Sequence, residues 1–210
     1  MRTGTIRAAV QLGFLALFVA TVALGTPQIW IIVFIGGLIL SVMASRAYCG
    51  WACPINTLLR PIRWLYARAG VSRREVPRPA HPWAVRSLVV ALFLAAMALA
   101  LLMGGSFPVL LIVLVVGVVI SLVVQEELFH RYLCPFGVLL HLTSGKSWVS
   151  MKVDEERCNA CGACVKACPN GAAHLEEKAS IEGEECLLCF RCQEACPVDA
   201  IEYSRRENNR

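Results

Sequence analysis

Two runs of cysteines in the last third of the chain carry the strongest chemical signal. Each run has the spacing C-x-x-C-x-x-C-x-x-x-C-P, with three thiols three positions apart and a proline after the fourth. The runs are Cys158, Cys161, Cys164 and Cys168, followed by Cys186, Cys189, Cys192 and Cys196. This spacing lets a tight loop wrap three corners of a [4Fe–4S] cube, while the fourth thiolate ligates the cluster of the other run.

The pattern therefore predicts two [4Fe–4S] clusters with crossed ligands and no catalytic residue. The first set is Cys158, Cys161, Cys164 and Cys196, and the second set is Cys186, Cys189, Cys192 and Cys168. Structural zinc is the alternative, but four-cysteine zinc sites do not normally use this full run twice. The 11 cysteines are odd in number, and eight have metal-site spacing. Both facts argue against a disulfide framework and favour a reducing compartment, the cytosol.

A second cysteine pattern occurs twice, after each pair of apolar segments. Residues 48–56 read Y-C-G-W-A-C-P-I-N, and residues 129–137 read F-H-R-Y-L-C-P-F-G. The shared frame places His130 where the first copy has a cysteine, so the residues available are Cys49, Cys53, Cys134 and His130. If the two copies meet, three thiolates and one imidazole would form a further iron–sulfur site at the membrane edge. Imidazole ligation raises a cluster's potential, as in Rieske centres, which suits acceptance from quinol. Buried thiols, or a dithiol with a decayed second copy, are the alternative.

The segments that must position these cysteines are strongly apolar. The chain is 57% hydrophobic with a mean hydropathy of +0.61, which is typical of a membrane protein. No charge occurs in residues 8–45 or 87–125, and glycine and proline near residues 25–27 and 104–108 divide each stretch. Four helical spans are expected at about residues 8–24, 28–45, 87–103 and 108–125, each near the lower limit for a ~30 Å hydrocarbon core. A signal peptide at the first segment and a buried helical core are the alternatives.

Charge predicts the orientation of these spans. The loop from Arg46 to Arg86 carries eight arginines and one glutamate, so it is expected on the cytoplasmic side, together with both termini. Residues 1–153 hold 13 lysines and arginines against three acids, whereas residues 154–210 hold seven against 12. The basic part fits anionic lipid head groups, and the acidic part fits a solvated surface that steers a protein partner. No nucleic-acid-binding motif is present.

The expected fold class is an α-helical membrane protein, four transmembrane helices as two hairpins, with a C-terminal α+β two-[4Fe–4S] ferredoxin domain. Residues 1–150 would form the transmembrane region, with both C-P motifs at its cytoplasmic face, and residues 151–210 the ferredoxin-type domain. The apolar content of this domain is thin, so metal ligation should supply much of its folding energy. The sequence has no intramembrane histidine pair, no C-x-x-C-H and no glycine-rich nucleotide fingerprint, which argues against haem, NAD and ATP.

These motifs resemble the NapH/NosR/CcoG group of polyferredoxin-type membrane proteins, and most of all NapH, a quinol dehydrogenase membrane component. The resemblance extends over nearly the whole chain and rests mainly on the element Cys49/Cys53-Pro54. It implies passage of electrons from membrane quinol, with a ferredoxin-like partner, toward a periplasmic acceptor. The sequence departs from the group at His130, where the second motif normally has a cysteine, and in the short connection between the first two spans.

The leading hypothesis is a membrane-bound iron–sulfur protein that relays electrons from quinol or a ferredoxin-like partner to a redox enzyme. It would be an electron-transfer subunit rather than a stand-alone enzyme, in a prokaryotic plasma membrane. The alternative is an assembly or maturation factor that supplies electrons for metalloenzyme biogenesis, and a redox sensor ranks last. Glu126 and Glu127 are candidates to accept a quinol proton, although an interfacial helix end is the other interpretation.

Overall fold

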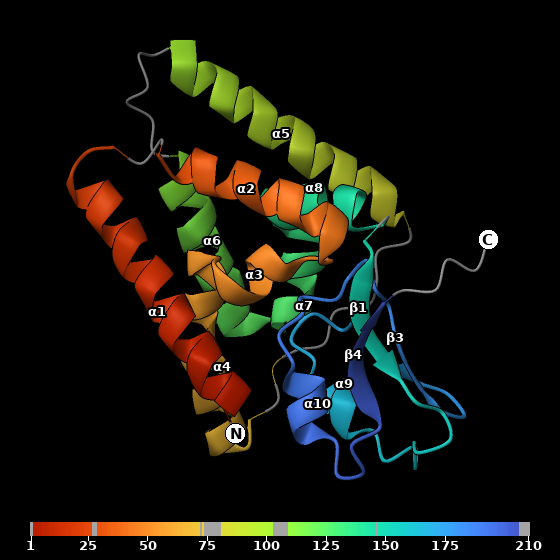
Figure 1. The fold of residues 1–210 in the computed structure, drawn as a ribbon. Coiled ribbons are helices and arrows are strands. Elements are labelled where there is room, and N and C mark those ends of the chain that lie inside the picture. Colours follow the sequence, from red (N-terminus) through yellow and green to blue (C-terminus); the bar gives the residue numbers. More distant parts are fainter. Residues whose placement is uncertain are drawn as a thin grey trace. The chain divides into compact units, whose positions relative to one another are not determined.

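The computed structural model describes residues 2–26, 29–71, 73, 81–102, 109–145 and 147–205 (Figure 1). The chain is mostly helical, with a C-terminal part built from short strands and helices. It forms two compact units, residues 1–54 with 140–210, and residues 55–139. The predicted turn at residues 104–108 lies outside the described residues. Residues 74–80 of the arginine-rich loop also lie outside them.

The first unit begins with three helices, α1 (Arg2–Ala23), α2 (Ile29–Met43) and α3 (Ala47–Trp51). α1 starts several residues before the expected apolar segment, because charged residues are compatible with a helix and Arg7 is buried in an ion pair with Glu194, 3.6 Å away. α2 ends at Met43, and Ser45 then adopts a left-handed conformation that turns the chain into α3.

The second unit contains α4 (Pro54–Ala69), α5 (Pro82–Leu102), α6 (Val109–Val123), α7 (Glu126–Leu128), the π-helical turn η1 (Phe129–Leu133) and the start of α8 (Pro135–Ser144). Two described helices of the chain, residues 3–23 and 82–102, are long and apolar enough to cross a membrane. α2 and α6 are apolar too, but each has only 15 residues. The described residues therefore contain two candidate membrane spans and two shorter apolar helices.

The first C-P motif follows a backbone turn that is wider than an α-helical turn. The N–H of Cys53 donates to the carbonyl of Tyr48, five residues earlier, over 3.0 Å. The ring of Tyr48 packs on Gly37 of α2, where a Cβ atom would lie only 2.6 Å from the ring. Pro54 then opens α4, at a position where its missing N–H leaves no helical bond unmade.

The second C-P motif has the same local structure. The N–H of Cys134 donates to the carbonyl of Phe129 over 2.7 Å, again across five residues. The Phe129 ring packs on Gly117 of α6, where a Cβ atom would lie 2.5 Å from the ring. Pro135 opens α8. Each copy thus consists of an apolar helix, an aromatic residue seated on a helix glycine, a five-residue turn and a Cys-Pro helix start.

The C-terminal module (residues 149–205) contains two small antiparallel sheets and two short helices. The elements are β1 (Val149–Val153) paired with β4 (Ile201–Arg205), β2 (Ala173–Leu175) paired with β3 (Ala179–Ile181), α9 (Ala163–Ala167) and α10 (Arg191–Ala195). In the first pair Met151 lies opposite Tyr203, and Val153 opposite Ile201. Small residues and cysteines dominate the buried core. So little apolar volume leaves much of the stabilisation to the cysteine sites.

Candidate metal centre

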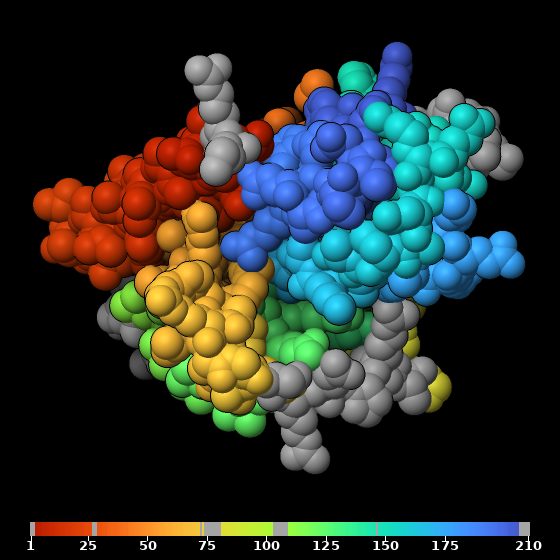
Figure 2. Space-filling view, turned by 90° about the horizontal axis from the view of Figure 1, so that it is seen from below, coloured from red at the N-terminus to blue at the C-terminus, as the bar shows by residue number. Residues whose placement is uncertain are grey.

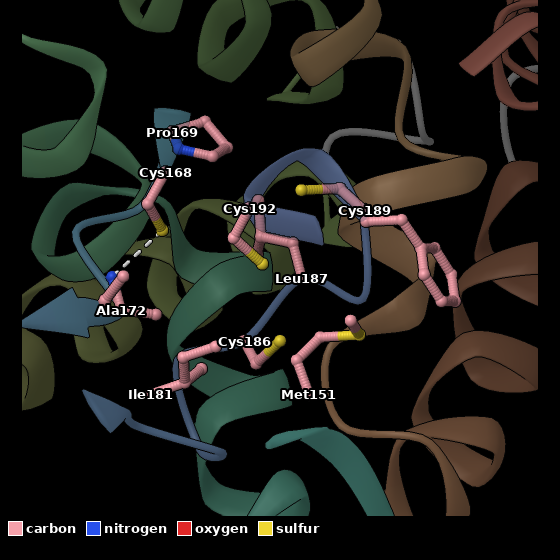
Figure 3. A pocket seen from close by; sticks show the side chains of 11 residues that line it. Met151, Cys168, Pro169, Ala172, Ile181, Cys186, Leu187, Cys189 and Cys192 are labelled. Atoms are coloured by element: carbon pink, nitrogen blue, oxygen red, sulfur yellow. Dashed lines mark hydrogen bonds between the residues drawn. The ribbon is translucent and has the colours of Figure 1, made fainter. Parts of the chain in front are cut away.

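Each of the two predicted cysteine sets lines one cavity of the C-terminal module. The first cavity is lined by Cys158, Cys161, Cys164 and Cys196, together with residues of α9, β3 and β4. The second is lined by Cys168, Cys186, Cys189 and Cys192, together with Met151 and Phe190. Figure 3 shows the four sulfur atoms of the second set directed toward one space. The fourth cysteine of each run therefore lies with the first three of the other run.

The two cysteine loops are structural repeats offset by 28 residues. In the first loop Ala160 and Gly162 have positive φ, and in the second loop Leu188 and Phe190 do. Left-handed backbone is unfavourable for residues other than glycine, so three of these four positions carry strain that the surrounding structure must hold. The spacing predicts the cysteine sets but gives no sign of these backbone conformations, because alanine, leucine and phenylalanine do not favour them.

Backbone N–H groups are directed at the cysteine sulfurs. Ala172 donates to Sγ of Cys168 over 3.2 Å, and Ala200 donates to Sγ of Cys196 over 3.3 Å, each from four residues further along the chain. The N–H of Leu188 also donates to Sγ of its neighbour Cys186 over 3.4 Å. Such bonds favour the thiolate over the thiol, and they tune the potential of a cluster that the thiolate holds.

Burial acts against the thiolate form at the second cavity. It raises the pKa of Cys186 to about 11 and raises the pKa of Cys192 still further. At the first cavity, hydrogen bonds from the backbone of Ala179 and Ala160 lower the pKa of Cys158. A group of buried thiolates needs a cation at its centre, and iron bound to the sulfurs supplies that charge. The donor set therefore fits a cluster.

Among the described residues, no three histidine, cysteine, aspartate or glutamate side chains are grouped closely enough to hold a single metal ion.

Helix α3 packs directly on the second cysteine loop, within the first unit. An added Cβ on Gly50 would clash with the carbonyl oxygen of Leu187, so only glycine permits this approach. The indole N–H of Trp51 donates to the carbonyl of Leu188 over 2.9 Å. The backbone N–H of Arg46 donates to the carbonyl of Cys186 over 3.0 Å. Three consecutive loop residues, 186–188, thus contact the α3 segment, defined here as α3 together with Arg46 just before it.

A buried charged network supports the same contact. The Arg46 guanidinium, fully buried, pairs with Glu185, which is also buried. Asn170 donates to the Glu185 carboxylate over 3.1 Å, and His141 Nδ1 lies 3.2 Å from it. Removal of one partner from such a pair would leave an unpaired buried charge, at a cost of about 3–5 kcal/mol. The sequence places Arg46 in the arginine-rich loop but gives no local signal of its partner, because Glu185 lies 139 positions away.

The four residues of the second pattern are all buried, in two units. Cys49 and Cys53 lie at α3 in the first unit, and His130 and Cys134 lie at η1 and its end in the second. Burial raises the pKa of Cys49, opposed by the charge and a hydrogen bond of Arg46. Whether the four residues bind iron together stays a prediction.

Glu126 is buried at the start of α7, where it pairs with two arginines. Its carboxylate is 2.8 Å from Arg63 and 3.0 Å from Arg73. Glu127 is more exposed and lies 3.4 Å from Arg131. The arrangement of Glu126 favours the interpretation as a structural anchor at the helix end.

Comparison with protein families identifies iron–sulfur domains over most of the chain. A "4Fe-4S binding domain" model matches residues 26–70 and 106–154, so each matched segment contains one apolar helix and one C-P motif. A "4Fe-4S dicluster domain" model matches residues 150–207, which contain both cysteine runs. No solved structure matches the chain.

Several proteins of known sequence are similar to the chain. The methylamine utilization ferredoxin-type protein MauN of Methylorubrum extorquens is 30% identical over 60% of this chain and 48% of its own length. The putative electron transport protein YccM of Escherichia coli is 27% identical over 63% of this chain and 44% of its own length. The ferredoxin-type protein NapH of Haemophilus influenzae is 26% identical over 61% of this chain and 49% of its own length. The matches thus span about half the length of these relatives.

Proposed function

We infer that this chain, a ferredoxin-type [4Fe–4S] electron-transfer protein related to NapH and MauN, relays single electrons at a membrane between quinol or a ferredoxin-like partner and a redox enzyme. The observation that carries this proposal is the pair of cavities, each lined by four cysteines drawn from both runs. When bound there, [4Fe–4S] clusters would supply one-electron chemistry. The chain's own residues ligate, insulate and orient them.

We further propose four spans, with α2 and α6 completing the two hairpins. At 1.5 Å per residue a 15-residue helix covers about 22 Å, less than a ~30 Å core, so local thinning of the bilayer or flanking residues must make up the difference. The large side chains Ile32 and Ile39 of α2 are 70% and 67% exposed in the isolated chain, which suits contact with lipid. The arginine-rich loop, both termini and the C-terminal module would then be cytoplasmic.

The proposed orientation makes a prediction for reporter fusions. Alkaline phosphatase fused to the C-terminus should be inactive, and green fluorescent protein at the same place should fluoresce, because the C-terminus is cytoplasmic. A matched pair of fusions in the turn at Thr26, after α1, should give the opposite result. Active phosphatase at the C-terminus would contradict both the four-span topology and the orientation.

The electron-relay role is tested by reduction with quinol. Washed membranes that contain the protein should show the electron paramagnetic resonance (EPR) signals of reduced clusters when duroquinol is added, and membranes without the protein should not. Clusters that are reduced by dithionite but never by quinol would exclude quinol as the donor. The ferredoxin-like partner would then remain as the source of electrons.

A maturation role is the second candidate. The chain is similar to MauN, whose name links it to methylamine utilization, and a protein of that kind could supply electrons for the assembly of an enzyme. In that case loss of the chain would leave a metalloenzyme inactive even when its artificial electron donors are supplied. In the relay role, artificial donors would restore activity to the enzyme.

A further inference from the structure

The two cysteine loops have similar backbones but very different surroundings. At equivalent positions, Leu187 and Leu188 of the second loop are each only 3% exposed, whereas Asn159 is exposed and Ala160 is half-buried in the first. The middle cysteine of each loop follows the same trend, because Cys161 is exposed and Cys189 is half-buried. The burial of the second loop therefore comes from its surroundings and not from the backbone shared by the two loops.

The residues after each fourth cysteine differ in the same way. Pro169 and Asn170, which follow Cys168 of the second set, are buried. Pro197 and Val198, which follow Cys196 of the first set, are exposed. Both stretches that border the second cavity are therefore covered, and both that border the first cavity are open.

The covering residues come mainly from the α3 segment. Gly50 touches the Leu187 carbonyl, Trp51 donates to the Leu188 carbonyl, and the Trp51 ring meets Phe190 edge-on with centroids 6.2 Å apart. α1 contributes a second contact with the module, at Arg7 and Glu194, and Figure 2 shows its red atoms beside the blue atoms of the C-terminal module. Gln11 of α1 also donates to the Gly50 carbonyl over 2.8 Å, which fixes α3 from its other side.

We propose that Gly50 and Trp51 are positioning residues that make the second cysteine set the site where electrons enter or leave on the membrane side. α3 shields this loop from water and keeps it close to Cys49, whereas the first set is open to soluble redox proteins. Each transfer between the two sets moves one electron, and no bond forms or breaks. The proposal rests on the electron-relay role and assigns an order to the two sites within it.

The order can be tested by changing the contact at Gly50. In the full chain, Gly50→Ala adds a Cβ at the carbonyl of Leu187 and must displace the loop. The EPR signal and midpoint potential of the second set should shift, and those of the first set should stay unchanged. Gly13→Ala is the matched control, since a Cβ there meets nothing within 4 Å. Cys161→Ser and Cys189→Ser, which alter one ligand of each set, assign the two signals.

Wild-type protein provides a test that does not depend on a variant folding. An impermeant, water-soluble dysprosium chelate should speed the relaxation of the first set's signal and leave that of the second set unchanged. Equal relaxation of both signals, or equal shifts of both in Gly50→Ala, would overturn the proposed order. A wild-type protein with no cluster signal would instead contradict the electron-carrier role itself.

Discussion

Cys189→Ala should remove about half of the cluster iron, from about eight to about four iron atoms per C-terminal module. Cys189 lines the second cavity with three other cysteines, and a cube lacking one thiolate corner is lost or poorly retained. The module should also unfold at a lower temperature, because its apolar core is thin and metal ligation supplies folding energy. Iron and sulfide analysis with thermal unfolding under anaerobic conditions measures both effects.

Two further variants serve as comparisons for this prediction. Cys161→Ala should remove the other half of the iron, since Cys161 lines the first cavity. Ser180→Ala, an exposed non-cysteine change in β3, should retain all of it. A Cys189→Ala protein with the full wild-type iron content and spectrum would show that this residue is not a ligand.

Cys49→Ala, Cys134→Ala and His130→Ala should each remove the same additional EPR signal and the iron held beyond that of the module. This expectation follows from the membrane-edge site that the sequence motifs predict, in which three thiolates and one imidazole would act as a single set. Both copies of the motif place Cys-Pro after the same five-residue turn. π-type turns of this kind are frequent at functional sites.

His81→Ala is the control for the membrane-edge site, because His81 is an exposed histidine of the same chain. It should leave the iron content, spectra and rate of electron transfer unchanged. If the three membrane-edge variants behave like this control, Cys49, Cys134 and His130 have a packing role only, and the relay must rest on the C-terminal module alone.

The parts of this protein that sequence predicts well are those set by local chemistry. The spacing of the ferredoxin-type repeat predicts the two cysteine sets, each of which lines one cavity, and the apolar segments follow directly from hydropathy. The boundaries are less certain from sequence: strand β1 begins at Val149 and pairs with the last strand, a partnership across about fifty residues that no local pattern marks.

Other features depend on tertiary contacts that leave little trace in one sequence. Arg46 belongs to the arginine-rich loop, and its guanidinium is buried against Glu185, a partner that no local pattern marks. No sequence pattern marks Gly50, and its importance is visible only because the Leu187 carbonyl lies against it. The covering of one cysteine loop had a faint signal in the pair Leu187-Leu188, apolar where the first loop has Asn159-Ala160.

The most direct test of the account is a metal and sulfide count on anaerobically purified, full-length protein. Two [4Fe–4S] clusters in the C-terminal module require about eight iron and eight acid-labile sulfide per chain, with further iron if the membrane-edge site also binds. The reduced protein should then give EPR signals from both cysteine sets. Stoichiometric zinc with iron and sulfide near zero would contradict the account, because the cysteines would then hold structural metal ions and carry no electrons.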